Sequence, residues 1–199
     1  MMSNIYDVVC CRRTIRRFKN TPLPEELFIK LINAARLAPS GANLQPCEYL
    51  VIDEPHLVDS VFSCLKWAGY IAPAGNPPPG KRPVSYIVVL IDLYRKKKGG
   101  SVDAAAAIEN MLLTAWGEGV GSCWLGSIDR KRIKKMLRIP HHLDVNSVVA
   151  LGYPDEQPRL EESDHSVKYW KDKNGVLHVP KRKLEDLCHR NGYGLKPEI

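Results

Sequence analysis

The sequence predicts an α+β fold in which one β-sheet packs against helices. Amphipathic helix patterns come first in the chain, and short β-branched runs then alternate with further helices. The run 86–91 (YIVVLI) is dense enough in apolar residues to indicate a central strand covered on both faces. The chain has 199 residues, of which 44% are hydrophobic and 26% charged, so it can bury an apolar core of ordinary globular type.

Four helices are expected from capping residues and apolar periodicity. A short helix follows the capping residue Asn4, and a second begins after Pro24 and ends before Pro39. A long Ala-rich helix starts at Asp103 and is apolar around most of its circumference, which indicates a buried central helix. The fourth starts at Asp129 and turns six Lys and Arg residues outward.

Strands are expected between these helices, at 49–52, 84–91, 122–125 and 145–151. The tripeptide 173–175 (KNG) lies between two short apolar pairs and predicts a hairpin turn. The whole chain, 1–199, is expected to be a single domain. Its last part, about 155–199, is polar and is expected to be an extension that wraps around a neighbouring surface such as a second subunit.

The charge balance restricts the kind of partner. With 29 Lys and Arg against 22 Asp and Glu, the net charge is +7, which suggests an anionic partner: nucleic acid, a membrane surface or a phosphorylated small molecule. The longest apolar run is far too short to span a bilayer, and no signal peptide is evident, so a cytoplasmic protein is expected. The six cysteines are scattered without metal-ligand spacing, which is typical of reduced thiols.

The densest motif is the run 12–18 (RRTIRRF). Arginine guanidinium groups and a threonine hydroxyl are the groups that bind phosphate oxygens, so Arg12, Arg13, Thr14 and Arg16 are candidate phosphate ligands. A solvated basic turn is the alternative. The interleaved Ile and Phe side chains indicate that part of the run is anchored, and both readings stay open on local grounds.

A second motif is the loop 38–46 (APSGANLQP). Composition alone is compatible with a plain helix-terminating loop. The functional alternative is a rigid loop that aims Ser40, Asn43 and Gln45 at a polar, planar ligand. A hydrolase nucleophile at Ser40 is disfavoured because no GxSxG elbow surrounds it.

Other segments resemble functional motifs less closely. The run 75–82 (GNPPPGKR) matches GxxxxGK, but its prolines have no N–H groups to bind phosphate, so a nucleotide-hydrolysing site is rejected. The basic helix face 130–138 is read as solvated rather than as a nucleic-acid surface. The segment 121–126 is either core strand or a place where Gly126 lets a flat ligand approach the backbone.

Taken together, these segments resemble the FMN-dependent nitroreductase family. The resemblance rests on RRTIRRF, APSGANLQP, DAAAAIENMLLTAWGEGVGSCWLG, VVALGYP and VPKRKL, which follow in the family's order from about residue 4 to residue 184. It departs from the family at Cys47, where many relatives have an aromatic residue, and in the loosely matching stretch 66–81, so Lys66 and Trp67 receive no firm role.

The resemblance implies a nitroreductase-like fold: a central mixed sheet flanked by helices, in a homodimer whose C-terminal extension embraces the partner. It also implies FMN at the dimer interface. The residues that it assigns to the cofactor are Arg12, Arg13, Thr14, Arg16, Pro39, Ser40, Gly41, Asn43, Gln45, Leu125, Gly126, Lys181, Arg182 and Lys183. No catalytic side chain and no metal are implied, because a flavin carries out the redox chemistry itself.

The activity implied is ping-pong hydride transfer from NADH or NADPH through FMN to a small planar acceptor, such as a nitroaromatic or a quinone. Nucleic-acid and membrane partners are not expected. Two alternatives remain at this stage: a reductive dehalogenase or flavin-consuming relative, and a flavin-binding storage or regulatory protein without turnover.

Overall fold

The computed structural model describes residues 4–163 and 165–197. The chain divides into two compact units, which are described separately. Unit 1 is built from the chain up to Trp67 and from Asn76–Glu156, and unit 2 from Ala68–Gly75 and the chain from Gln157 onward.

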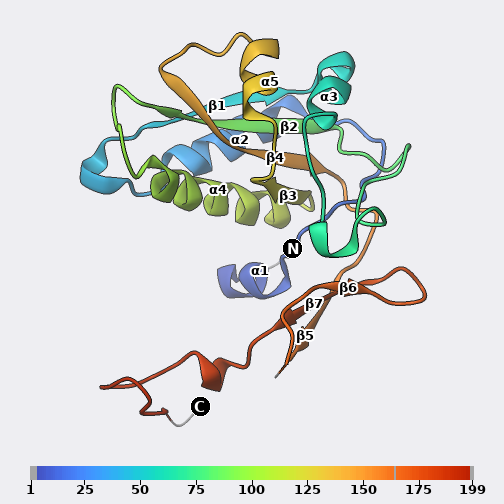
Figure 1. Cartoon of the computed structure of the whole chain (residues 1–199), viewed down its shortest axis with the longest axis vertical. Coiled ribbons are helices and arrows are strands. Elements are labelled where there is room, and N and C mark those ends of the chain that lie inside the picture. Colours follow the sequence, from blue (N-terminus) through green and yellow to red (C-terminus); the bar gives the residue numbers. More distant parts are fainter. Residues whose placement is uncertain (1–3, 164, 198–199) are drawn as a thin grey trace. The chain divides into compact units, whose positions relative to one another are not determined.

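Unit 1 contains a four-stranded sheet with the strand order β1-β2-β4-β3 (Figure 1). The strands are β1 (Cys47–Ile52), β2 (Ser85–Asp92), β3 (Gly121–Leu125) and β4 (Leu143–Gly152). Each neighbouring pair of strands is antiparallel, and an isolated bridge from Thr14 to Ser122 adds a parallel pairing at β3. Every residue of β2 is buried, which confirms the central strand predicted from the run 86–91.

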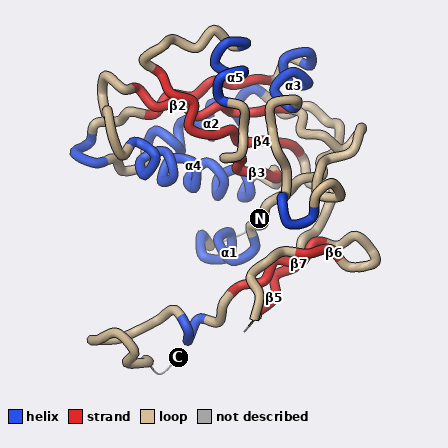
Figure 2. Tube along the Cα trace, in the orientation of Figure 1, coloured by secondary structure: helices blue, strands red, loops and turns tan. Residues whose placement is uncertain are grey.

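Helices cover both faces of this sheet, so unit 1 has three layers (Figures 1 and 2). The helices of unit 1 are α1 (Ile5–Cys11), α2 (Glu25–Arg36), α3 (Pro55–Phe62), α4 (Gly100–Gly117) and α5 (Arg130–Met136). One hydrophobic cluster joins the sheet to α2 and α4, and a second joins it to α3 and α5. The predicted α+β fold is confirmed.

The predicted helix caps are present. The Asn4 side chain accepts a hydrogen bond from Tyr6 N at 3.0 Å, and Asp129 accepts one from Arg132 N at 3.0 Å. Helix α4 begins at Gly100, three residues earlier than predicted. It also buries only one side, and Val102 on the outer side is 72% exposed. The helix is apolar on two faces, and unit 1 buries only one of them, so α4 is not buried all round as the sequence predicted.

Unit 2 contains a three-stranded sheet in the order β5-β7-β6. Strand β7 (Leu177–Lys181) pairs in parallel with β5 (Arg159–Glu162) and antiparallel with β6 (Trp170–Lys171). The predicted hairpin turn connects β6 to β7: the Asp172 carboxylate accepts hydrogen bonds from Asn174 N and Val176 N at 2.9 and 2.8 Å. Gly175 has the left-handed φ of 77° that such a turn requires.

No helix among residues 4–163 and 165–197 is both long and apolar enough to cross a membrane. All six cysteines are free thiols.

Candidate functional site

The arginine segment 12–18 lies along strand β3. Thr14 forms the parallel bridge to Ser122, and Ile15 N donates to the Ser122 carbonyl oxygen at 2.9 Å. Burial raises the pKa of the Cys123 thiol to about 11, and the positive charge of Arg16 opposes this rise. The Arg16 guanidinium therefore lies close to Cys123 on β3. The sequence expectation that part of the run is anchored is therefore met by contacts along one strand.

Two glycines make this anchoring possible. Ile15 and Phe18 are fully buried. A Cβ on Gly121 would lie 2.8 to 3.0 Å from three atoms of Ile15, and a Cβ on Gly152 would lie 2.9 to 3.2 Å from three atoms of Phe18. The absence of side chains at Gly121 and Gly152 thus lets the segment pack directly on the ends of β3 and β4.

The backbone of the segment is fixed, while its cations stay at least partly accessible. The Glu156 carboxylate accepts hydrogen bonds from Arg16 N and Arg17 N at 2.5 and 3.2 Å. Arg12 Nε lies 3.5 Å from Glu109 Oε1 on α4. Burial and the neighbouring charge of Arg12 lower the pKa of Arg13, which means that its surroundings disfavour a further positive charge. Such a cluster of cations attracts an anion.

The opposite end of β3 is open. Leu125 is buried, whereas Gly126 is exposed, and a Cβ added at Gly126 would meet nothing within 4 Å. Beside it, Lys66 N donates to the Ser127 carbonyl oxygen at 3.0 Å, so an exposed lysine stands next to this strand end. Trp67 is 5% exposed and packs against Phe62 in the core, with ring centroids 5.8 Å apart.

The polar loop 39–45 lies at a different part of unit 1, between α2 and β1. Gly41, Asn43 and Gln45 are exposed, and Asn43 and Gln45 have the left-handed φ values of 55° and 48°. Ser40 Oγ accepts a hydrogen bond from Gln45 N at 3.0 Å, so the Ser40 side chain closes the loop on itself. Pro39 is exposed at the start of the loop.

A cavity of about 220 Å³ lies beneath this loop, and Ser40, Gln45, Cys47 and Tyr49 line part of it. Burial and the nearby Asp103 carboxylate raise the pKa of Cys47, and burial together with Cys47 raises that of Tyr49. Both groups are therefore protonated at neutral pH. The thiol at position 47 is a small, neutral wall of the cavity.

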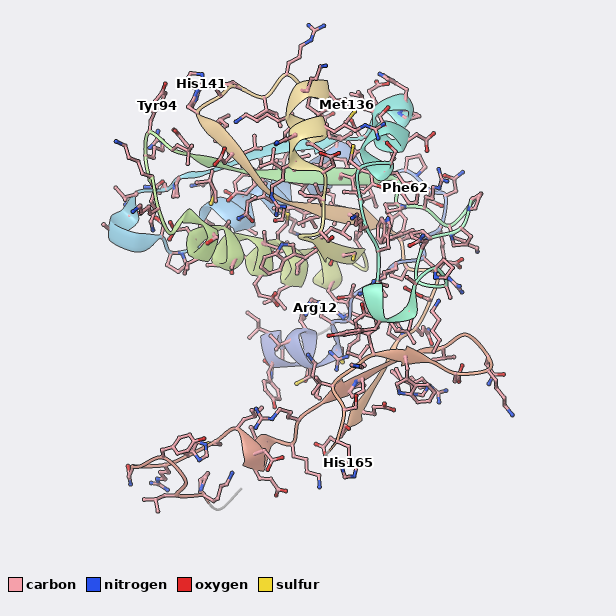
Figure 3. The ribbon with its side chains drawn as sticks, in the orientation of Figure 1. Arg12, Phe62, Tyr94, Met136, His141 and His165 are labelled. Carbon is pink, nitrogen blue, oxygen red and sulfur yellow. The ribbon has the colours of Figure 1, made fainter. Side chains whose placement is uncertain are left out.

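The arginine segment and the loop contact helix α4 at different places. The loop bonds to α4 through Asp103 and the arginine segment through Glu109. Six residues along a helix correspond to about 9 Å along the axis and about 120° around it. Figure 3 shows Arg12 and Tyr94 at different edges of unit 1, Tyr94 preceding the connection that leads into α4. The loop leads into β1 and the arginine segment lies along β3, and these two strands form opposite edges of the sheet. One chain thus keeps the two predicted halves of the site apart.

The predicted C-terminal cations belong to unit 2. Lys181 ends strand β7 and is exposed, as is Arg182, which donates to the Asp186 carbonyl oxygen at 3.2 Å. Lys183 follows and is partly buried. All three lie close together at the end of one strand.

Comparison with known proteins identifies the family. Residues 11–74 and 87–153 match the family model described as "Nitroreductase family". The chain belongs to the nitroreductase family. The matched residues include the whole arginine segment 12–18, the loop 39–45 and the whole of β3.

Individual members of the nitroreductase family resemble the chain over most of its length. A protein of Archaeoglobus fulgidus, named provisionally as NADH dehydrogenase/NAD(P)H nitroreductase, is 31% identical over 170 residues, which cover 82% of this chain and 92% of that protein. An NADPH-dependent oxidoreductase of Staphylococcus aureus is 27% identical and aligns with 87% of this chain and 77% of its own length. The solved FMN-dependent nitroreductase of Clostridium difficile has a TM-score of 0.69 at 24% identity, covering 94% of this chain and 98% of its own, and shows the same fold.

Two features of this nitroreductase-family site were not predicted from the sequence. Lys66 was left without a role, and its position beside Gly126 depends on a pairing of Leu65 with Ile128 that no local pattern reveals. The connection of the loop to Lys96 and Asp103 was also missed, although Asp103 was read as a helix start.

Proposed function

We propose that this chain is an FMN-dependent oxidoreductase that transfers hydride from NADH or NADPH to a small planar acceptor, such as a nitroaromatic or a quinone. We propose further that it acts in the cytoplasm as a homodimer of single-domain protomers, with residues 155–199 as an extension toward the partner. Membership of the nitroreductase family and the names of the relatives support the reaction class. The layout of strand β3 is the observation that carries the cofactor assignment.

Strand β3 offers a cationic end and an open end. The arginine segment lies at Ser122, and the open backbone at Gly126 is four residues away. Four residues of extended strand span about 13 Å. FMN is elongated in the same way, with a dianionic phosphate at one end and a flat ring at the other, so it fits this layout. Arg12, Arg13, Thr14 and Arg16 would hold the phosphate and ribityl chain, and Leu125 and Gly126 would face the ring.

The remaining residues assigned to the cofactor support a two-chain site. Asn43 and Gln45 offer amide donors and acceptors of the kind that match the polar rim of a flavin ring. Because loop 39–45 and the arginine segment lie at opposite edges of the sheet in one chain, the loop would reach the ring from the partner, together with Pro39, Ser40 and Gly41. Lys181, Arg182 and Lys183 would add positive charge toward the phosphate.

Exposed apolar surface also supports a homodimer. Helix α1 buries none of its residues, and Ile5, Tyr6 and Val9 are 75%, 68% and 48% exposed. A helix of seven residues is not stable in water without packing, and exposed apolar side chains of this size mark an interaction surface. Val102 on the outer side of α4 adds to this surface. A second copy of the chain would cover both helices.

When bound, FMN supplies the centre that accepts hydride from NAD(P)H and passes it to the acceptor. The protein has no need of a nucleophile or metal for this chemistry. Its own residues bind the cofactor phosphate with charge-assisted hydrogen bonds, orient the ring at the end of β3 and leave room beside Gly126 for a planar molecule. The Lys66 ammonium, next to the same strand end, would favour negative charge there.

Complementation between two defective variants tests the shared site. The Arg12→Ala/Arg16→Ala protein and the Asn43→Ala/Gln45→Ala protein are each expected to lose FMN and NAD(P)H oxidation. After unfolding and refolding as an equimolar mixture, half of the dimers are mixed and one site of two in these is intact, so about a quarter of the wild-type activity is expected. No recovery in mixtures that contain mixed dimers would contradict a site built from two chains.

A panel of acceptors under anaerobic conditions tests the reaction class. Turnover with nitroaromatics or quinones is expected to show ping-pong kinetics. A protein that holds FMN but oxidises NAD(P)H slowly with every acceptor would instead be a flavin-binding protein without turnover.

A further inference from the structure

An ion pair between a half-buried lysine and a buried carboxylate lies beneath the loop 39–45. Lys96 Nζ is 2.6 Å from Asp103 Oδ2, and the two side chains are 19% and 5% exposed. The other carboxylate oxygen, Asp103 Oδ1, accepts a hydrogen bond from Gly41 N at 3.0 Å. One carboxylate therefore connects the loop, the segment after β2 that carries Lys96, and the first turn of α4.

The loop needs such a connection because its backbone is strained. Ala42, Asn43 and Gln45 have φ values of 52°, 55° and 48°, a region unfavourable for residues with a Cβ. Hydrogen bonds within the loop, such as Asn43 N to the Ser40 carbonyl oxygen at 2.9 Å, fix its turns. The Gly41–Asp103 bond is what ties the middle of the loop to α4.

Position 41 is fitted to the lysine. A Cβ on Gly41 would lie 2.8 Å from Lys96 Nζ, closer than ordinary van der Waals contact. The ammonium group thus passes directly over the glycine backbone on its way to Asp103. The backbone that carries Lys96 is fixed as well. Lys96 N donates to the Asp92 carbonyl oxygen at 3.0 Å, and Asp92 N donates to the Pro46 carbonyl oxygen at 2.8 Å.

The Asp103 carboxylate stays ionised at neutral pH. Burial opposes ionisation of Asp103, but the hydrogen bonds from Lys96 and from Gly41 N outweigh it, and the pKa of Asp103 is lowered. A buried carboxylate that is paired and doubly hydrogen-bonded is a rigid anchor, since breaking it would leave an uncompensated charge.

We propose that Lys96 and Asp103 are positioning residues for FMN: through Gly41, their ion pair holds loop 39–45 in the conformation in which Asn43 and Gln45 meet the flavin ring. The proposal rests on the proposed function. The ion pair does not contact the ring; it raises the fraction of molecules whose loop 39–45 is in the conformation that binds FMN. If its loss leaves about a tenth of the molecules competent, the Kd for FMN rises about tenfold.

The test compares FMN binding by four variants with that of the wild type. Lys96→Met and Asp103→Asn each break the pair, and Lys96→Met/Asp103→Asn removes both charges, so that no unpaired buried charge remains. Lys96→Arg keeps the positive charge and is expected to bind FMN with a Kd within about threefold of the wild-type value. The matched control is Glu118→Gln, which removes the exposed Lys30–Glu118 pair of the same 2.6 Å length.

Two readouts are measured below the unfolding temperature of each variant: the Kd for FMN by quenching of flavin fluorescence, and hydrogen exchange of the Gly41 amide without FMN. The pair-breaking variants are expected to raise the Kd for FMN about tenfold and to speed exchange of the Gly41 amide. The Kd of the double variant should not exceed that of the single variant that binds FMN more weakly. The Glu118→Gln protein should match the wild type in both.

The outcomes separate the two proposals. Faster Gly41 exchange with wild-type FMN affinity would show that the pair only stabilises the fold, and it would overturn the positioning role. Unchanged exchange and unchanged affinity would overturn the connection itself. A wild-type protein that fails to bind FMN at all would refute the proposed function instead.

Discussion

Two glycines at the two ends of strand β3, Gly121 within it and Gly126 directly after it, should respond differently to the same substitution. Gly121 lies where the buried Ile15 packs on the strand, and Gly126 lies at the open end proposed for the flavin ring. Gly126 lies outside the left-handed region, so alanine fits its backbone. The pair Gly121→Ala and Gly126→Ala therefore separates fold stability from cofactor binding at the two ends of β3.

The expected magnitudes follow from the neighbouring atoms. At Gly121 the new methyl would lie 2.8, 2.9 and 3.0 Å from Ile15 Cγ1, Cβ and Cγ2. One of these is the Cβ itself, so a rotamer change cannot relieve the overlap and the backbone must shift. Overpacking of this kind costs about 1–3 kcal/mol. At Gly126 the methyl meets nothing within 4 Å, and the stability should change by less than about 1 kcal/mol.

Urea unfolding measures stability and fluorescence quenching measures the Kd for FMN. Gly121→Ala should lower the unfolding midpoint and, by moving the arginine segment, weaken FMN. Gly126→Ala should keep the wild-type midpoint and still raise the Kd, because its methyl would occupy space next to the ring. Wild-type stability of Gly121→Ala would refute the packing argument, and wild-type FMN affinity of Gly126→Ala would place the ring elsewhere.

Three further predictions concern charges and caps. The Arg12→Ala/Arg16→Ala protein should bind FMN at least about tenfold more weakly, since charge-assisted bonds to the phosphate are lost, whereas Lys131→Ala on the basic face of α5 should bind like the wild type in the same titration. Asp129→Ala removes the cap that accepts from Arg132 N and should cost about 1 kcal/mol in urea unfolding; an unchanged midpoint would contradict the capping role. Hydrogen bonds from Val176 N and Asn174 N lower the pKa of Asp172, so the carboxylate stabilises the hairpin of unit 2 above its unfolded pKa of about 3.9, and this contribution is lost as the pH falls through the lower folded value. Tryptophan fluorescence between pH 5 and about 2 should therefore change less in Asp172→Asn than in the wild type; equal changes would argue against the carboxylate's role.

The sequence predicted the main elements of unit 1 because their signals are local. Asn4 and Asp129 are capping residues in sequence and in structure, and the run 86–91 is apolar enough to define the central strand. Helix α3 and strand β5 were not predicted. Both are short, and strand β5 is half-exposed or exposed along its length, with its pairing to β7 a long-range contact.

The site was only partly predictable for the same reason. The residue types of the arginine segment and the loop 39–45 indicate phosphate and a polar planar ligand, but their placement at opposite edges of the sheet depends on the fold. The connection of Gly41 to Lys96 and Asp103 joins three segments distant in the sequence, each of which looks ordinary alone. Only Asp103 carried a local signal, and that signal was interpreted as a helix start.

The visible absorption spectrum of the purified protein, with the released chromophore identified, tests the central claim most directly. A bound flavin identified as FMN, at about one per protomer, is the expected result, because each site would use the arginine segment of one chain. A colourless protein that also takes up no added FMN as a dimer would contradict the cofactor assignment and leave only the shared fold.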